Sequence, residues 1–373
     1  MAATLLVSIS PINVYADESK IDFEQYRIEA INQELLLRGY SNLQSFGITH
    51  ALDEETRNNV EDLKNAEIVF MKFDDSGQLS TAESSEKGNV INNFVKETRD
   101  VEYIFTVSNE IASPSMATKS DVSIQSVLKD TIPTPAGADT GAFHRLKTPT
   151  STRSLNFTGG VADDVTLPGY NFANTDGESA YLYTGIDNGE TGIAEVGFGT
   201  YNGSKGKGWF PLFHARASHK VITQPGNEKD SEEYYFDYTK NYGSGNKTIN
   251  GYKVFYKLAE KDEDPDPILT ITYQIGYSTL YVIQFPDYKA SNKSVKRVTA
   301  IAMPKGTSGK FKNPFTSYAN WGNYRFLTQN GASTVYPGNV SGLIENTWSH
   351  GGSIDYIKNV ISSTDRDEQY KIY

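Results

Sequence analysis

The chain contains no cysteine in its 373 residues. This absence excludes a disulfide framework, a thiol nucleophile and any metal site built from cysteine thiolates. The sequence also lacks an uninterrupted apolar run of about 18 residues, which is the length that a membrane-spanning helix requires. We therefore expect a protein without membrane insertion, whose stability comes from the packing of its core.

The chain has fewer basic than acidic residues. Lysine and arginine together number 35, against 46 aspartates and glutamates, which gives a net charge of −11 and an isoelectric point near 5.1. Nucleic acids and anionic membrane surfaces would repel such a chain at long range. We expect neither of them as a partner.

Sequence patterns typical of common catalytic sites are missing as well. The five histidines show no H-E-x-x-H or H-x-H pair, so a zinc hydrolase is not indicated; they are His50, His144, His214, His219 and His350. No G-x-S-x-G turn marks a nucleophile. The glycine-rich stretch 203–208 lacks the full phosphate-loop pattern. The sequence therefore assigns no catalytic residue and no metal ligand.

The first sixteen residues, MAATLLVSISPINVYA, carry no charge and end in small residues before a polar stretch. This pattern predicts the remnant of a secretory signal peptide, with cleavage after Ala16 and a natural start upstream of Met1. A buried N-terminal strand is the alternative. On the first interpretation the protein is secreted.

Residues 17–112 predict a small α/β domain. Asp22 can cap a helix over residues 23–38, and Gly39 lies where a helix C-cap belongs. Asp53 can cap a second helix that runs to about Asn65. Strands are expected over residues 67–73 and 101–107. The stretch from 113 to 150 is rich in Ser, Thr, Ala and Pro, which predicts a linker.

Residues 151–373 are typical of an all-β domain. Short runs of β-branched and aromatic residues alternate with Gly, Asn and Asp turns, which favours a jelly-roll or concanavalin-like β-sandwich. The expected strands are 165–172, 179–186, 193–201, 208–216, 233–240, 251–259, 268–276, 279–285, 295–303 and 323–327. The fold class is thus mostly β, with the small α/β domain at the N-terminus.

Three segments of this region resemble the YrpD-like family of secreted proteins from Bacillus and relatives. They are AYLYTG (180–185), AEVGFGTY (194–201) and GWFPLF (208–213), and VKRVTAIA (295–302) is similar to a late strand of that family. The resemblance covers about residues 150–330 and implies export and a concanavalin-like sandwich. The family is functionally uncharacterised, so the resemblance supplies no catalytic residue.

The aromatic residues suggest a ligand surface. Twenty of the 24 tyrosines and all three tryptophans follow residue 151. On strand 193–201, Ala194, Val196 and Phe198 should face the core, while Glu195 and Tyr201 should share the other face with two glycines. We call the predicted set the aromatic surface: Tyr181, Tyr183, Glu195, Tyr201 and Trp209.

This surface predicts a noncatalytic protein that binds an extracellular glycan or a cell-wall polymer, since aromatic faces stack on sugar rings. One alternative is a glycosidase or polysaccharide lyase that pairs Glu195 with a second carboxylate such as Asp237. Another is a structural surface or coat-associated protein without a ligand. Tyrosines that only fill strands would account for the same composition.

The acidic stretches of the sequence give weaker indications of a functional site than the aromatic residues do. Glu228, Asp230 and Glu232 have the E-x-D-x-E spacing of some sandwich glycosidases, but polar residues fill the positions between them, which indicates a solvated loop. Asp262, Glu263, Asp264 and Asp266 within the stretch 260–267, or the pair Asp163 and Asp164, are candidates for calcium. Neither has the loop signature of a known calcium site, so plain acidic turns are favoured and no cofactor is assigned.

Overall fold

The computed structural model describes residues 21–40, 52–74, 77–100, 128–130, 141–150, 157–172, 178–187, 193–216, 231–259, 268–285, 293–302, 315–328, 331–350 and 368–371. The predicted leader (1–16), the strand expected at 101–107 and the acidic stretch 260–267 lie outside these residues.

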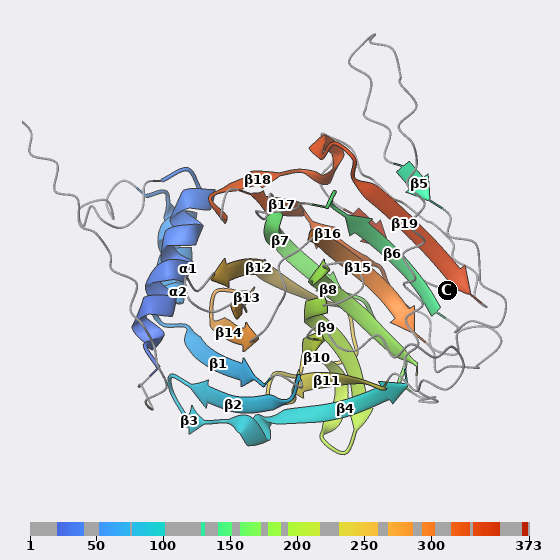
Figure 1. Ribbon diagram of the computed structural model, residues 1–373, viewed down its shortest axis with the longest axis horizontal. Coiled ribbons are helices and arrows are strands. Elements are labelled where there is room, and N and C mark those ends of the chain that lie inside the picture. Colours follow the sequence, from blue (N-terminus) through green and yellow to red (C-terminus); the bar gives the residue numbers. More distant parts are fainter. Residues whose placement is uncertain are drawn as a thin grey trace, which may run out of the picture.

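Two large sheets form the fold, as the sequence predicted for a β-sandwich (Figure 1). The first sheet has the order β18 (Ser333–Val335), β17 (Arg325–Thr328), β7 (Phe157–Leu167), β12 (Lys247–Ala259), β13 (Ile268–Ile275), β14 (Thr279–Phe285), β1 (Glu67–Phe73), β2 (Leu79–Ser84) and β3 (Gly88–Asn89), and β16 (Ala319–Gly322) pairs with β7 and with β20 (Glu368–Tyr370). The second has the order β4 (Phe94–Asp100), β11 (Ser231–Asp237), β10 (Gly206–Arg216), β9 (Ile193–Gly203), β8 (Ser179–Asp187), β15 (Ser294–Ala302), β6 (Gly141–Lys147), β19 (Ile344–His350) and β5 (Leu128–Asp130). Single 3₁₀ turns cover Ile91–Asn93 and Pro337–Asn339.

Both predicted helices are present, at α1 (Phe23–Leu37) and α2 (Glu54–Lys64). The carboxylate of Asp22 accepts the backbone N–H of Gln25 at 3.1 Å, and Gly39 ends the helix with a φ of +82°. The helices lie side by side against the outer face of the first sheet (Figure 1), where they cover apolar side chains of β1 and β14. Within the described residues, no helix is long and apolar enough to cross a membrane.

The N-terminal strands belong to the two sheets. β1 pairs in parallel with β14, and β4 pairs antiparallel with β11 of the other sheet. These pairings join the segment to the sandwich, in place of the separate α/β domain expected over residues 17–112. The apolar run of β1 was visible in the sequence, but its strand partner lies about 200 residues away, and local patterns carry no information on such pairing.

The predicted linker also requires a correction. Its last residues form β6, which lies inside the second sheet between β15 and β19. Ala142 and Leu146 pack into the main core, while Phe143 packs on the opposite face. This alternation is the signature of a strand, and the Ser- and Pro-rich residues before it obscured the signal.

The main core lies between the sheets and is rich in tyrosine. Tyr256 and Tyr273 extend from the first sheet and donate to the backbone carbonyls of Thr184 and Gly197 in the second, each at 2.8 Å. Each ring fills the space between the layers while its hydroxyl finds a partner on the far side. Core packing therefore accounts for these tyrosines without a ligand.

Candidate functional site

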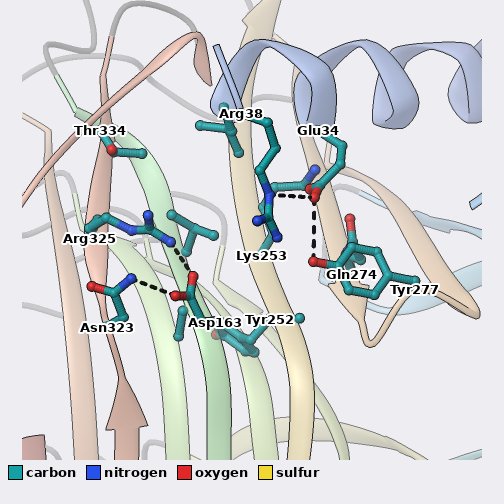
Figure 2. Close-up of a pocket in the computed structure, with 14 residues that line it drawn as sticks. Glu34, Arg38, Asp163, Tyr252, Lys253, Gln274, Tyr277, Asn323, Arg325 and Thr334 are labelled. Atoms are coloured by element: carbon teal, nitrogen blue, oxygen red, sulfur yellow. Dashed lines mark hydrogen bonds and ion pairs between the residues drawn. The ribbon is translucent and has the colours of Figure 1, made fainter. Parts of the chain in front are cut away.

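A polar pocket of about 240 Å³ lies between α1 and the outer face of the first sheet. Side chains of α1 form one wall, and β7, β12, β13, β17 and β18, together with the turn residues Tyr277 and Asn323, supply the rest (Figure 2). Its charged and amide lining includes Glu34, Arg38, Asp163, Lys253, Gln274 and Arg325. We call it the α1 pocket.

Strand alternation brings Lys253 and Gln274 to this pocket. Tyr252 and Val254 pack into the main core, so Lys253 between them faces the helix side of the sheet. On the adjacent strand, Tyr273 points into the core, and Gln274 after it points to the pocket. Lys253 and Gln274 are directly opposite each other in the β12–β13 register. Side chains in this relation have Cβ atoms about 4.5–5.5 Å apart.

Each of these buried side chains has a polar atom without a hydrogen-bond partner among the described residues. Lys253 is 2% exposed and Gln274 is 1% exposed, and neither the Nζ of Lys253 nor the Oε1 of Gln274 makes a hydrogen bond with the described residues. Burial lowers the pKa of the Lys253 ammonium below its ordinary value of 10.5, and the negative charge of Glu34 opposes this change. A buried polar group left unpaired costs about 1–3 kcal/mol, so such groups in a native protein call for an explanation.

Glu34 does not pair with Lys253, because three other groups hold its carboxylate. Its Oε1 lies 3.3 Å from the Nε of Arg38, and the Tyr277 hydroxyl donates to it at 3.4 Å (Figure 2). The Nδ2 of Asn59, on α2, donates to the same oxygen at 3.1 Å. Arg38 also bonds to Glu55, at 2.7 Å. Glu34 thus fixes α1 to α2 and to the sheet.

On the wall of the pocket opposite α1, a carboxylate is likewise bonded to neighbouring side chains. Asp163 on β7 accepts hydrogen bonds from Arg325 and from the amide of Asn323 (Figure 2). Both arginines of the lining therefore bond to carboxylates, and Lys253 is the lining cation that does not.

We expect Lys253→Met to raise the free energy of unfolding by about 1–3 kcal/mol at pH 7, because methionine fills similar space without a desolvated charge. The lowered pKa of Lys253 means that the unfolded chain binds this proton more readily between that pKa and 10.5. Wild-type stability should therefore rise with pH through this window, and the variant should lose the rise.

Urea unfolding between pH 7 and pH 10.5 measures both effects. Lys257→Met is the matched control, because Lys257 lies on the same strand with a 56% exposed side chain and only a loose contact to Glu29, at 3.6 Å. The control should change neither the free energy of unfolding at pH 7 nor its rise with pH. A clear loss of stability in the Lys253 variant would show that the ammonium is well accommodated in the fold.

The predicted aromatic surface is buried and divided between two faces. Tyr181, Tyr183 and Tyr201 lie with Glu195 on the outer face of the second sheet, with exposed fractions of 1%, 2%, 8% and 3%. The predicted alternation of β9 is found, since Ala194, Val196 and Phe198 pack into the main core. The residues are thus neighbours, but they offer little open area to a ligand.

Trp209 lies on the other face, which corrects the expectation that it belongs to this surface. It is fully buried in the main core, and its indole N–H donates to the carbonyl of Pro168 at 2.9 Å. Phe210 takes the outward position instead, with its ring 5.8 Å from that of Tyr201. The sequence located the strand but placed its first aromatic residue on the wrong side.

Glu195 is the centre of a buried charge cluster. Its carboxylate lies 2.6 Å from the Nζ of Lys296 and 3.1 Å from the Nδ1 of His214. Gly185 provides the space, since a Cβ there would lie 2.8 Å from Lys296 and 3.1 Å from Glu195. Burial raises the pKa of the Glu195 carboxyl, but the charge of Lys296 and the contact with His214 together lower it to about 2.

The second carboxylate that a glycosidase would need does not face Glu195. Asp237 points into the space between the sheets, where its Oδ2 accepts the hydroxyl of Tyr281 at 2.7 Å. Glu195 and Asp237 therefore lie on opposite faces of the second sheet. Glu228 and Asp230 lie outside the described residues, and only the backbone of Glu232 is described, within β11.

Calcium binding is not assigned by the structure. Asp163 is bonded to Arg325, and Asp164 accepts from the amide of Asn320 at 3.2 Å. Within the described part of the chain, no three His, Asp or Glu side chains gather as a metal ion would require. The acidic stretch 260–267 stays a prediction.

Sequence reasoning missed the α1 pocket. Its one visible signal is a lysine in the middle of the apolar strand YKVFY (252–256), where a charge on a sheet face needs a partner. Which residues surround Lys253 depends on the docking of α1, and the spacing of the sequence does not report that docking.

Comparisons with known proteins do not identify a family or an activity for this chain. No family model and no curated protein matches the chain, so the resemblance to the YrpD-like family stays a prediction. Two solved structures of scytalido-glutamic peptidase, each with a transition-state analog, are similar at TM-scores of 0.33 and 0.34, with 9% and 10% identity. Each covers 63% of this chain and all of the peptidase chain. A likeness this weak carries no argument about activity.

Proposed function

We propose that this is a secreted, noncatalytic protein that binds a carbohydrate or cell-wall polymer, and that one sugar residue occupies the α1 pocket. The observation that carries the proposal is the adjacent pair of unpaired buried groups, the ammonium of Lys253 and the carbonyl oxygen of Gln274. One is a donor and the other an acceptor. A hydroxylated ring satisfies both, because each hydroxyl can donate and accept.

The size and lining of the pocket support a single ring. Its volume of about 240 Å³ is below the range of about 300–1,000 Å³ that is usual for drug-sized ligands. Tyr277 contributes aromatic surface beside the polar groups, a combination that suits a sugar. Thr334, on β18, is exposed at the margin, where the rest of a polymer has access to solvent.

The state of Glu195 supports binding without catalysis. A glycosidase needs one carboxyl that keeps its proton near neutral pH and a second carboxylate across the cleft. The pKa of Glu195 is lowered to about 2, and Asp237 lies on the other face of the sheet.

A binding screen of the full chain against glycans and cell-wall polymers, followed by product analysis, tests the proposal. We expect binding without released sugars, and roughly tenfold weaker binding for Gln274→Met, which removes one hydrogen bond. Gln284→Met on the neighbouring strand is the control, since Gln284 does not line the pocket and should not affect binding.

Two results would contradict this function. The first is the absence of binding to every glycan in the screen. The second is a glycan that binds equally well to wild type and to the Gln274 variant, which would move the site elsewhere on the molecule.

A further inference from the structure

The α1 pocket has a lysine at its floor that makes no ion pair with the described residues. Lys253 lies 2% exposed beneath α1, and no carboxylate of the lining bonds to it. Arg38 and Arg325, the other two cations of the lining, already bond to Glu34 and Asp163. A buried ammonium is costly unless an opposite charge accompanies it. Among the described residues of the lining, Lys253 is therefore the cation without an ion pair.

Resting on the function proposed above, we propose that the sugar residue bound in the α1 pocket is acidic. Its carboxylate pairs with the Nζ of Lys253, and a neighbouring hydroxyl donates to the Oε1 of Gln274. The ligand class is thus a polymer that contains uronic acid or another sugar with a carboxylate.

A carboxylate suits the pocket better than a neutral ring does. A neutral hydroxyl would satisfy the hydrogen bond of Lys253 but would leave its charge buried without a counterion.

A carboxylate suits the pocket better than a phosphate monoester as well. Glu34 and Asp163 remain in the lining, so a dianion would place its second negative charge beside two carboxylates. A guanidinium is the usual partner of a phosphate in bidentate geometry, and both guanidinium groups of the lining are already bonded to carboxylates. Lys253 is the one cation of the described lining without an ion pair, and a single carboxylate supplies one.

Gln274 adds a further requirement on the ligand. Its Oε1 is an acceptor without a donor, directly opposite Lys253 across the two strands. A simple carboxylate such as acetate offers no donor for this position, whereas a sugar acid carries hydroxyls next to its carboxylate. The two groups together select a hydroxylated acid.

The test compares two ligands that differ only in charge: an oligouronate, and the same oligosaccharide after its carboxyl groups have been reduced to alcohols. Calorimetry with the full chain should show at least tenfold tighter binding of the oligouronate at low salt. Lys253→Met should remove this preference and leave weak binding of both ligands, while Lys257→Met should bind like wild type. Acetate and a sugar phosphate serve as further probes and should bind more weakly than the oligouronate.

The outcomes separate this inference from the proposed function. Equal binding of the charged and reduced ligands, or a preference for the sugar phosphate, would overturn the carboxylate and leave a glycan-binding protein. Binding of neither oligosaccharide would overturn both. Since Lys253→Met is expected to be more stable than wild type, a lost preference in this variant does not come from unfolding.

Discussion

Glu195→Gln is expected to lower the free energy of unfolding by about 3–5 kcal/mol at pH 7, the usual loss when one partner is removed from a buried ion pair. The carboxylate of Glu195 and the ammonium of Lys296 lie 2.6 Å apart, with side chains 4% and 2% exposed. Glutamine keeps the shape but removes the negative charge, so the desolvated ammonium loses its counterion. Urea unfolding, monitored by circular dichroism, measures the loss.

The pH dependence of stability provides a second measurement. The pKa of Glu195 falls from an ordinary 4.5 to about 2 in the folded protein, so the unfolded chain takes up this proton first as the pH drops. The stabilisation is complete above pH 4.5 and is lost as the pH falls toward 2, which amounts to about 3 kcal/mol. The glutamine variant should lack this part of the acid dependence.

Two further variants make the result specific. Glu61→Gln removes a carboxylate from an exposed pair with Lys64 on α2 and should have little effect. The double variant Glu195→Leu/Lys296→Met should recover part of the loss, because it leaves no unpaired charge at this place. Wild-type stability in Glu195→Gln would show that Lys296 does not depend on this carboxylate.

Local signals predicted much of the fold. The helix boundaries follow from Asp22, Gly39 and Asp53, whose capping roles do not depend on distant residues. Strands β8, β9, β10, β13, β14 and β15 lie close to their expected ranges because their runs of β-branched and aromatic residues are bounded by turn residues. β7 begins earlier than expected, at Phe157, because two glycines weaken its pattern.

The pairing of strands was beyond the reach of such signals. β1 lies beside β14 and β4 beside β11, and these contacts join segments far apart in the sequence. The candidate site could not be predicted from local sequence patterns for the same reason. Lys253 and Gln274 become a pair only through the β12–β13 register, and the pocket exists only because α1 lies over them. In contrast, the position of Glu195 opposite the core follows from period 2 alone.

Trp209→Ala should lower the free energy of unfolding by about 3–5 kcal/mol, the usual loss for truncation of a large buried aromatic residue. The indole is fully buried among Tyr170 and Phe315, whose ring centres lie 6.4 Å from its own. Its N–H donates to the carbonyl of Pro168, which would lose this partner as well. Trp209→Phe should lose less, because most of the apolar contact remains.

This prediction separates a core residue from a ligand-binding residue. If Trp209 belongs to the core, both variants lower the free energy of unfolding, and Trp209→Ala lowers it more than Trp209→Phe. Either variant, if it folds, should then bind glycans as wild type does. Leu36→Ala on α1 is the control, since Leu36 is 37% exposed and its truncation should change stability little. A Trp209→Ala protein of unchanged stability that no longer binds glycans would show that Trp209 contacts the ligand. It would also contradict the proposal that the glycan binds in the α1 pocket.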